Sequence, residues 1–173
     1  MVIWLVGLSG VGKTTIGEAI YREMKSKNTG TVFVDGDRVR SLFQHDQDMV
    51  DYSLAGRRIS AERLQSLCVW LDSEGLDVVC CSISMFQDIN DANRDLFSNY
   101  REIFIDVPLE TLIARDNKGL YQAALAGKMM NVVGVDIPYR APTHVDLVIQ
   151  NSFKADALHG YVEDILRVCG AIH

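Results

Sequence analysis

The chain has 173 residues, of which 48% are hydrophobic and 23% are charged, and its formal net charge at pH 7 is −6. This length favours one domain, residues 1–173, with a full hydrophobic core. The acidic balance argues against a general nucleic-acid or membrane-surface binder. No apolar run approaches the ~20 residues that a membrane-spanning helix needs, and the first apolar run lacks a basic leader. We therefore expect a cytoplasmic protein with neither a nucleic-acid nor a membrane partner.

Four cysteines support the same expectation. They are Cys68, Cys80, Cys81 and Cys169, and none forms a CxxC pair or a spacing that suits zinc. Two of them lie inside an apolar run. Buried free thiols in a reducing compartment are the expected state.

Short apolar runs alternate with helical patterns along the chain. We predict strands at 2–6, 31–34, 76–83, 102–107 and 146–150, and helices at 14–24, 57–73, 91–97, 108–116 and 156–169. Runs that are apolar on both faces and alternate with helices predict an α/β fold, a five-stranded parallel sheet in a three-layer arrangement. Ligands of such sheets bind at the carboxyl ends of the strands. Residues 127–143 show no clear period and are typical of a lid.

The first strand is followed by GLSGVGKT at residues 7–14, which matches the phosphate-binding loop (Walker A) pattern. Its glycines let successive backbone N–H groups point at phosphate oxygens, and the helix that follows adds its positive end. Lys13 is predicted to reach the β- and γ-phosphates, and the Thr14 hydroxyl to hold Mg²⁺. The expected nucleotide-binding residues here are Gly7, Ser9, Gly10, Gly12, Lys13, Thr14 and Thr15. The alternative is a chance glycine turn.

Two carboxylates, Asp35 and Asp37, follow the second predicted strand. At the end of a parallel strand beside the phosphate loop, Asp35 can serve the metal and Asp37 can accept the proton of an attacking hydroxyl. The alternative is a surface turn. The third strand ends without an acidic residue and no NKxD motif follows, so a small-molecule kinase is favoured over a motor ATPase or a GTPase.

Arginines are concentrated in one span, at positions 38, 40, 57, 58 and 63. A solvated helix face and a pocket for an anionic substrate are both compatible with this cluster.

Several motifs resemble those of adenylylsulfate kinases. DGDRVR at 35–40 is similar to that family's DGDNVR segment. DVPLE at 106–110 and RDNKGLY at 115–121 look like its DxPLE and RDxKGLY motifs, and GVDIPY at 134–139 resembles its GIDxPYE stretch. The order and spacing hold from the glycine loop to the last strand, so the resemblance covers nearly the whole chain.

The resemblance implies a P-loop kinase that uses ATP and Mg²⁺ to phosphorylate the ribose 3′-hydroxyl of a nucleoside 5′-phosphate joined to a second acidic group. It implies that Asp37 lies near that hydroxyl and that Lys118 reaches down from a lid at about 117–143. It places Arg115 near ATP. The substrate residues that it implies are Asp37, Arg40, Tyr52, Arg57, Ser60, Ile83, Ser84, Lys118, Gly119, Leu120, Val132 and Val133. Dimerisation is common in the family, so it also suggests a homodimer.

The substrate-reading residues depart from the family pattern. Arg38 and Ser60 stand where the family has asparagine, and Val132 stands where it has a phenylalanine that faces a second aromatic across the adenine. Only Tyr52 is left to stack on the base. The stacking energy with a purine is therefore lower by on the order of 1 kcal/mol. Two substrates stay open: adenylylsulfate, in sulfate assimilation, and the smaller cytidine diphosphoramidate, in capsule biosynthesis. A sugar or shikimate-type kinase and a non-catalytic nucleotide-binding regulator are the remaining alternatives.

Overall fold

The computed structural model describes residues 1–43 and 51–171. Its centre is a parallel five-stranded sheet with the order β2-β3-β1-β4-β5. The strands are β1 (Val2–Val6), β2 (Thr31–Asp35), β3 (Asp77–Ser82), β4 (Tyr100–Asp106) and β5 (Leu147–Gln150). The predicted α/β fold and its five strands are confirmed.

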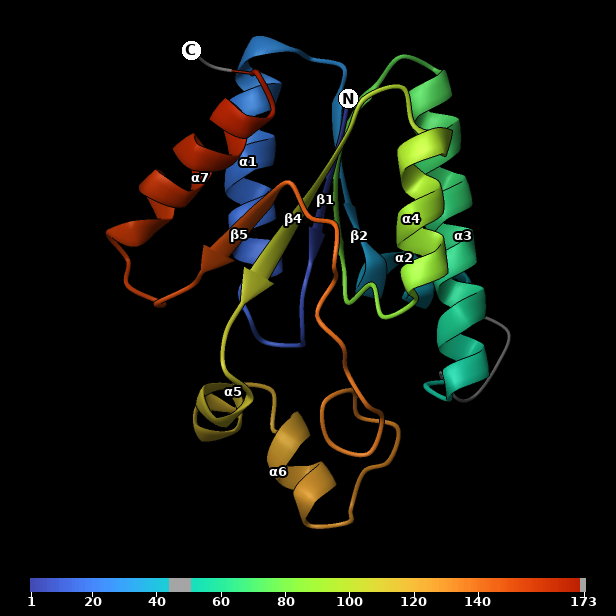
Figure 1. Cartoon of the computed structure of the whole chain (residues 1–173), viewed down its shortest axis with the longest axis vertical. Coiled ribbons are helices and arrows are strands. Elements are labelled where there is room, and N and C mark those ends of the chain that lie inside the picture. The colour runs from blue at the N-terminus through green and yellow to red at the C-terminus, as the bar shows by residue number, and fades with distance from the viewer. Residues whose placement is uncertain (44–50, 172–173) are drawn as a thin grey trace.

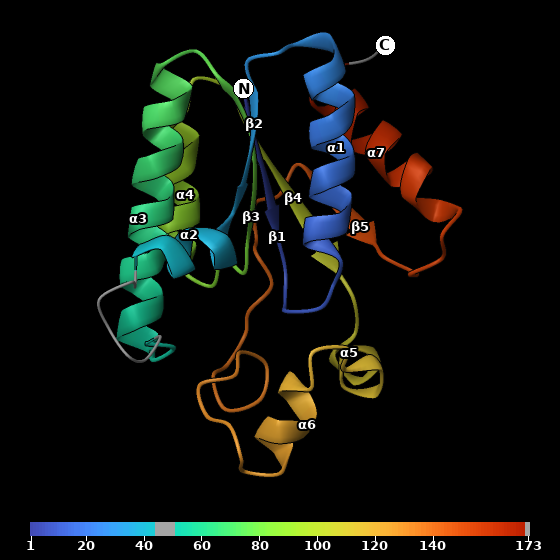
Figure 2. The ribbon, with the colours of Figure 1, turned by 180° about the vertical axis from the view of Figure 1, so that it is seen from behind.

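The described residues form seven helices, and some of these cover the two faces of the sheet. The helices are α1 (Lys13–Lys27), α2 (Gly36–Phe43), α3 (Leu54–Ser73), α4 (Gln87–Leu96), α5 (Leu109–Arg115), α6 (Leu120–Leu125) and α7 (Ala157–Val168). Figure 1 shows α1 and α7 on one face and α3 and α4 on the other, and Figure 2 shows the same layers from behind. The strands all point toward α5 and α6, so these two helices and the loop after them lie beyond the carboxyl ends of the sheet.

The sequence predictions missed two helices. The first is α2, which begins at Gly36, inside the segment interpreted as a possible turn. It forms because the Asp35 carboxylate accepts hydrogen bonds from the Asp37 and Arg38 N–H groups, which caps the helix start. The second is α6, whose first N–H groups, those of Tyr121 and Gln122, donate to the Asp116 carboxylate. Both helices are too short for a periodic pattern to stand out.

Two apolar clusters pack against the two faces of the sheet. On the α1 and α7 side, Ile3 and Leu5 of β1 meet helix residues such as Ile16 and Ile165. On the α3 and α4 side, Trp4 packs with residues such as Leu64. All of β1 is therefore buried, as its central position requires.

The last strand departs from the expectation that every strand is apolar and buried on both faces. Val148 of β5 is 45% exposed. The reason is topological, since β5 is an edge strand that pairs only with β4. Its outward face meets solvent.

The four cysteines are free and buried, as predicted. Burial raises the pKa of Cys81, beside α1, to about 12, so this thiol stays protonated at neutral pH. Among the described residues, no helix is long and apolar enough to cross a bilayer.

Candidate active site

The phosphate-binding loop lies between β1 and α1, as its pattern predicts. Gly10 and Gly12 have left-handed backbones with φ of 81° and 100°. At Gly7 a Cβ atom would lie 2.5 Å from the carbonyl oxygen of Ile105, so only glycine fits there. The chain thus passes close to β4 and then curls into the first turn of α1.

Lys13 folds back over this loop. Its Nζ donates to the carbonyl oxygens of Gly7 and Leu8, both at 2.7 Å. Burial lowers the pKa of Lys13 to about 8, a shift that the neighbouring Cys81, Asp37 and Asp35 partly oppose. A buried ammonium whose hydrogen bonds go to two carbonyl oxygens, with no carboxylate of the described residues in direct contact, favours an anionic ligand.

Thr14 and Asp35 join the start of α1 to the end of β2. The Thr14 hydroxyl donates to Asp35 Oδ2 at 3.0 Å, while Asp35 Oδ1 caps α2. Two hard oxygen groups therefore lie side by side at the edge of the phosphate loop. In the described residues, no group of three or more His, Cys, Asp or Glu side chains is placed to hold a metal.

Asp37 lies in the first turn of α2 and faces the cleft. Its side chain is 71% exposed, and its two oxygens lie 3.7 Å from Arg40 Nη1 and from Lys118 Nζ. Lys118 comes from the segment between α5 and α6. The structure thus brings together a carboxylate of the body and a lysine of residues 117–143, the segment that was predicted to be a lid and that we call the lid segment. Both residues were predicted to have catalytic roles.

Arg40, Arg57 and Tyr52 form a second group on the same side of the cleft. The guanidinium carbons of the two arginines lie 5.3 and 5.4 Å from the centre of the Tyr52 ring. Burial, and next the charge of Arg40, lower the pKa of Arg57. Ser60 contacts this group, since its Oγ accepts a hydrogen bond from Arg40 Nε at 3.2 Å. Two adjacent cations in a partly buried setting favour an anion.

The remaining arginines of the sequence cluster do not join this group. Arg58 pairs with Glu62 and Asp88 on the outside of α3 and α4, and the Arg63 guanidinium lies over the Phe43 ring. Arg38 is exposed and lies 3.9 Å from a Glu18 oxygen. The cluster therefore divides: two arginines face the cleft and three lie on solvated surfaces, because α2 and α3 turn their residues to different sides.

One cleft of about 600 Å³ connects these groups. Its lining includes most of the residues that the sequence assigned to nucleotide, metal or substrate: Ser9, Gly10, Gly12, Lys13, Thr14, Thr15, Asp35, Asp37, Arg40, Tyr52, Arg57, Ser60, Ile83, Ser84, Arg115, Lys118, Leu120, Val132 and Val133. Gly7 and Gly119 do not line it. Gly7 lies beneath the phosphate loop, and Gly119 has a left-handed backbone, φ 64°, that starts α6.

Val132 is 1% exposed and packs into the core while lining the cleft. The neighbouring carbonyl, that of Asn131, accepts a hydrogen bond from Arg57 Nη2 at 2.7 Å. This part of the segment before β5 is therefore tied to α3. The cleft lining next to Asn131 is aliphatic, since Val132 and Val133 follow it.

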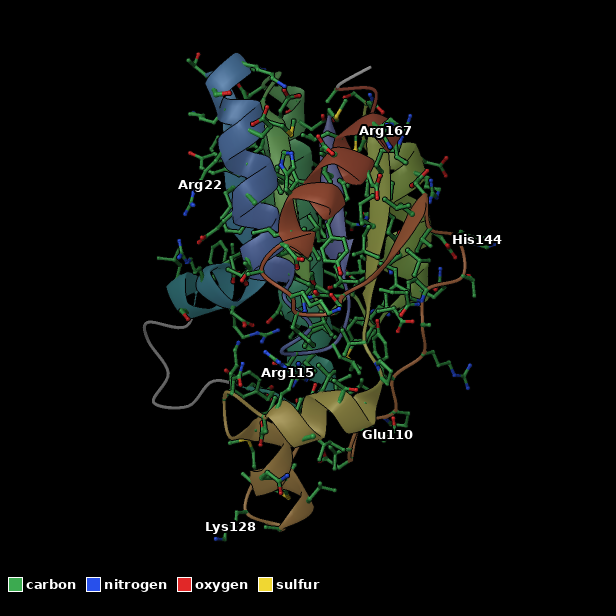
Figure 3. All side chains as sticks on the ribbon, turned by 90° about the vertical axis from the view of Figure 1, so that its left-hand side faces the viewer. Arg22, Glu110, Arg115, Lys128, His144 and Arg167 are labelled. Carbon is green, nitrogen blue, oxygen red and sulfur yellow. The ribbon has the colours of Figure 1, made fainter. Side chains whose placement is uncertain are left out.

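Arg115 lies where α5 meets the body, whereas Lys128 lies at the far tip of the lid segment (Figure 3). The Arg115 guanidinium carbon is 3.8 Å from the centre of the Phe153 ring. Sequence analysis missed Phe153, and it also missed Asn151, whose Nδ2 donates to the Val11 carbonyl of the phosphate loop at 2.7 Å. Both follow β5, and their place at the carboxyl end of that strand was the available signal.

Comparison with known proteins decides the family. The family model of adenylylsulphate kinase matches residues 1–150. The chain belongs to the adenylylsulfate kinase family. The matched region contains every residue that lines the cleft except Phe153.

Three relatives illustrate the range of the family. The chain is 43% identical over 166 residues to the cytidine diphosphoramidate kinase of Campylobacter jejuni, covering 96% of this chain and 94% of that protein. It is 34% identical over 166 residues to a probable adenylyl-sulfate kinase of Pseudomonas aeruginosa, covering 96% and 75%. An APS kinase of Mycobacterium tuberculosis, solved with AMPPNP and APS, superposes with a TM-score of 0.83 at 29% identity and covers 96% of each chain.

As a member of this family of ATP-utilising kinases, the chain is a phosphotransferase. The P-loop kinase fold predicted from the glycine loop is confirmed by the same comparisons. The alternative of a non-catalytic nucleotide-binding regulator is not supported, because the relatives that match over nearly the whole chain are named as kinases.

Proposed function

We propose that this kinase transfers the γ-phosphoryl group of ATP to the ribose 3′-hydroxyl of a nucleoside 5′-phosphate mixed anhydride. The observation that carries the proposal is the shared cleft. The phosphate loop, the Asp37–Lys118 pair and the Arg40–Arg57 pair all line it. A phosphate-binding loop, a carboxylate that can accept a proton and a pair of cations that can bind an anion thus line one cleft of about 600 Å³.

The roles of the residues follow from their charges. The phosphate loop and Lys13 hold the β- and γ-phosphates, as in other loops of this pattern. Asp37 accepts the proton of the attacking hydroxyl. Lys118 lies next to Asp37 and stabilises the negative charge on the transferring group. The γ-phosphoryl group passes directly from ATP to the 3′-oxygen, so Ser84 acts as a wall of the cleft and carries no phosphate.

The Thr14 hydroxyl and the Asp35 carboxylate fit Mg²⁺. This ion prefers hard oxygen ligands, and it is commonly bound through one or two protein groups together with substrate phosphates and waters. The observed 3.0 Å contact between Thr14 Oγ1 and Asp35 Oδ2 places both oxygens at the phosphate loop. When bound there, Mg²⁺ neutralises charge on the ATP phosphates.

The side chains expected to contact the base, Tyr52, Val132 and Val133, favour cytidine diphosphoramidate as the acceptor substrate. Tyr52 is the aromatic side chain beside the two arginines, and the lid segment offers aliphatic Val132 and Val133. A pyrimidine has less stacking area to satisfy than a purine. The 43% identity to a cytidine diphosphoramidate kinase supports the same choice.

A coupled ADP-release assay with Mg·ATP tests this proposal. Adenylylsulfate and cytidine diphosphoramidate are offered separately at matched concentrations, with gluconate and shikimate as acceptors of another class. We expect turnover with the cytidine compound to exceed turnover with adenylylsulfate. The opposite preference would assign the protein to sulfate activation, and turnover with only the sugar or shikimate acceptors would overturn the proposal.

A further inference from the structure

Ser84, which lines the cleft just after β3, has a strained backbone. Its φ is 51°, in the left-handed region that residues other than glycine rarely adopt. Such conformations persist at functional sites where the surroundings enforce them. The structure shows what enforces this one, because each polar group of Ser84 has a partner.

Three hydrogen bonds hold Ser84. Its N–H donates to Ser82 Oγ at 3.3 Å, and its carbonyl oxygen accepts from Asn90 Nδ2 at 3.4 Å. Its Oγ accepts from the indole Nε1 of Trp4 at 2.7 Å. Trp4 therefore occupies an acceptor position of the hydroxyl, which leaves the hydroxyl hydrogen free to donate to an anionic ligand in the cleft.

Asn90 connects this serine to a buried carboxylate. The same Nδ2 donates to Glu102 Oε1 at 3.3 Å, and Tyr100 Oη donates to Glu102 Oε2 at 3.0 Å. Asn90 and Glu102 are each 2% exposed. In the β1–β4 register Glu102 pairs with Trp4, so the carboxylate and the indole that holds Ser84 lie on the same face of the sheet.

We propose that Glu102 is a positioning residue of the acceptor-nucleotide site: as a carboxylate it fixes Asn90, Asn90 fixes the Ser84 backbone, and Ser84 is thereby held ready to donate to the bound nucleotide. A proton on Glu102 turns one of its oxygens from an acceptor into a donor, and Asn90 loses its charged partner. Ser84 is then released from its enforced conformation. The acceptor nucleotide binds more weakly as a result, while ATP, at the phosphate loop, binds as before.

Charged and titratable groups face Glu102 from each element packed around it. They are Tyr100 on β4, Arg94 and Asp91 on α4, and Asp146 and Tyr139 from the segment before β5. Cys80 on β3 lies next to Tyr100. Burial is the largest influence and raises the pKa of Glu102 to about 6. Asp146 and Asp91 act in the same direction, and the Tyr100 hydrogen bond and Arg94 oppose it.

Protonation of Glu102 weakens binding of the acceptor nucleotide without unfolding the protein. The folded protein holds the Glu102 proton more tightly than the unfolded chain, whose glutamate has the ordinary pKa of 4.5. Protonation of Glu102 therefore stabilises the fold as the pH falls from about 6 toward 4.5. A weaker substrate affinity near pH 6 must come from the cleft.

The kinetic test, which rests on the proposed function, compares the wild type with Glu102→Gln between pH 5 and pH 8. The hydrogen bond at stake predicts a rise of roughly fivefold to tenfold in the wild-type KM for the acceptor nucleotide below about pH 6. Glu102→Gln should show the raised KM at every pH. The pH dependence of kcat and of the KM for ATP should be the same in the wild type and in Glu102→Gln. A variant with the wild-type KM and the wild-type pH dependence would overturn the proposal.

Asp72→Asn is the matched control. Asp72 is also a buried carboxylate, 6% exposed, and it accepts two hydrogen bonds from Ser98. It lies near the N-terminal amino group, at the end of the sheet opposite the cleft. This variant should lose stability and keep the wild-type pH dependence of KM.

A spectroscopic test requires no substrate. Trp4 and the 60% exposed Trp70 are the two tryptophans, so a Trp70→Phe background isolates the signal of Trp4. We expect the Trp4 emission to titrate with a midpoint near pH 6, and Glu102→Gln to abolish this titration. Asn90→Leu, which leaves Glu102 beside the indole but removes the relay, should abolish it as well.

The two tests separate the two proposals. A Trp4 signal that does not titrate, or one that still titrates in Asn90→Leu, would overturn the role of Glu102 whatever the enzyme phosphorylates. A Trp4 signal that titrates as expected, in a protein that phosphorylates neither nucleotide, would support the coupling of Glu102 to Ser84 and overturn the proposed function.

Discussion

Lys118 Nζ lies 3.7 Å from Asp37 Oδ2, and this contact joins the lid segment to the first turn of α2. The two side chains are 62% and 71% exposed. An ion pair this open contributes about 0–1 kcal/mol to stability. Its importance lies in position, because it places the proposed proton acceptor and a lysine cation at the same point of the cleft.

Replacement of Asp37 by asparagine should slow phosphoryl transfer without unfolding the protein. Loss of a general base reduces kcat by roughly 10²–10⁴-fold. The KM for ATP and the melting temperature should stay close to wild type, because Asp37 is exposed and makes no short hydrogen bond through its side chain in the described structure. Steady-state kinetics and a thermal melt check both points. The control is Asp164→Asn on the outside of α7, and wild-type turnover in Asp37→Asn would refute the assignment.

Lys118→Met tests the charge that the lid segment supplies. Removing one group that stabilises transition-state charge should lower kcat about 10²–10³-fold. Lys128→Met is the comparison, because Lys128 belongs to the same segment but lies exposed at its tip (Figure 3). Equal activity of the two variants would show that Lys118 does not act on the reacting groups.

The buried Lys13 should take up a proton when ATP binds at alkaline pH. Burial lowers its pKa to about 8 in the free protein, so near pH 9 much of it is neutral. Phosphate oxygens favour the charged form and restore the proton. Calorimetric titrations of ATP in two buffers of different ionisation enthalpy measure this proton uptake. It should be clear at pH 9 and small at pH 7. Equal uptake at the two pH values would contradict this.

The lowered pKa of Lys13 also makes the stability of the free protein depend on pH. Between about pH 8 and the ordinary lysine value of 10.5, the unfolded chain holds the Lys13 proton and the folded chain does not. The penalty for burying the charge is therefore relieved, and the stability of the free protein through this group rises with pH in that window. Lys13→Met should remove this contribution in urea-unfolding series measured across the window.

Two helical glycines should respond to alanine in opposite directions. A Cβ on Gly17 of α1 would lie 2.6 Å from Cys81 Sγ and 2.9 Å from the Phe33 ring, whereas one on Gly160 of α7 would meet nothing within 4 Å. Gly17→Ala should lose about 1–3 kcal/mol through overpacking, and Gly160→Ala should gain about 0.5–1 kcal/mol through helix propensity. Urea unfolding measures both, and a stable Gly17→Ala would show that α1 can move away from β3.

Local patterns were enough to predict the phosphate loop and the two aspartates. Lys13 and Thr14 lie in one strand–loop–helix unit, and Asp35 ends the next strand along the chain. All three therefore fall at the carboxyl edge of a parallel sheet, which a sequence pattern can predict. The five arginines at 38–63 differ, because the direction in which each points depends on how α2 and α3 pack. Sequence spacing could not separate Arg40 and Arg57, at the cleft, from Arg58 and Arg63 on the surface.

Contacts between elements that are far apart in the sequence could not be predicted, because they also depend on how the elements pack. Phe153 meets Arg115, and Trp4 reaches Ser84 from another strand. The local sequence does not mark Trp4 as part of a site, and the one signal for Phe153 is that it follows the last predicted strand. Only the sheet order brings the ends of β3 and β4 beside β1, and the end of β5 beside β4.

The position of the transferred phosphate tests the central claim most directly. After incubation with Mg·ATP and cytidine diphosphoramidate, or with adenylylsulfate if that is the better substrate, the product is isolated for ³¹P–¹H correlation NMR. We predict a new phosphate coupled to the ribose H3′, and no product from the 3′-deoxy analogue. A phosphate on the 2′-oxygen or on the acidic group, or product from the 3′-deoxy compound, would contradict it.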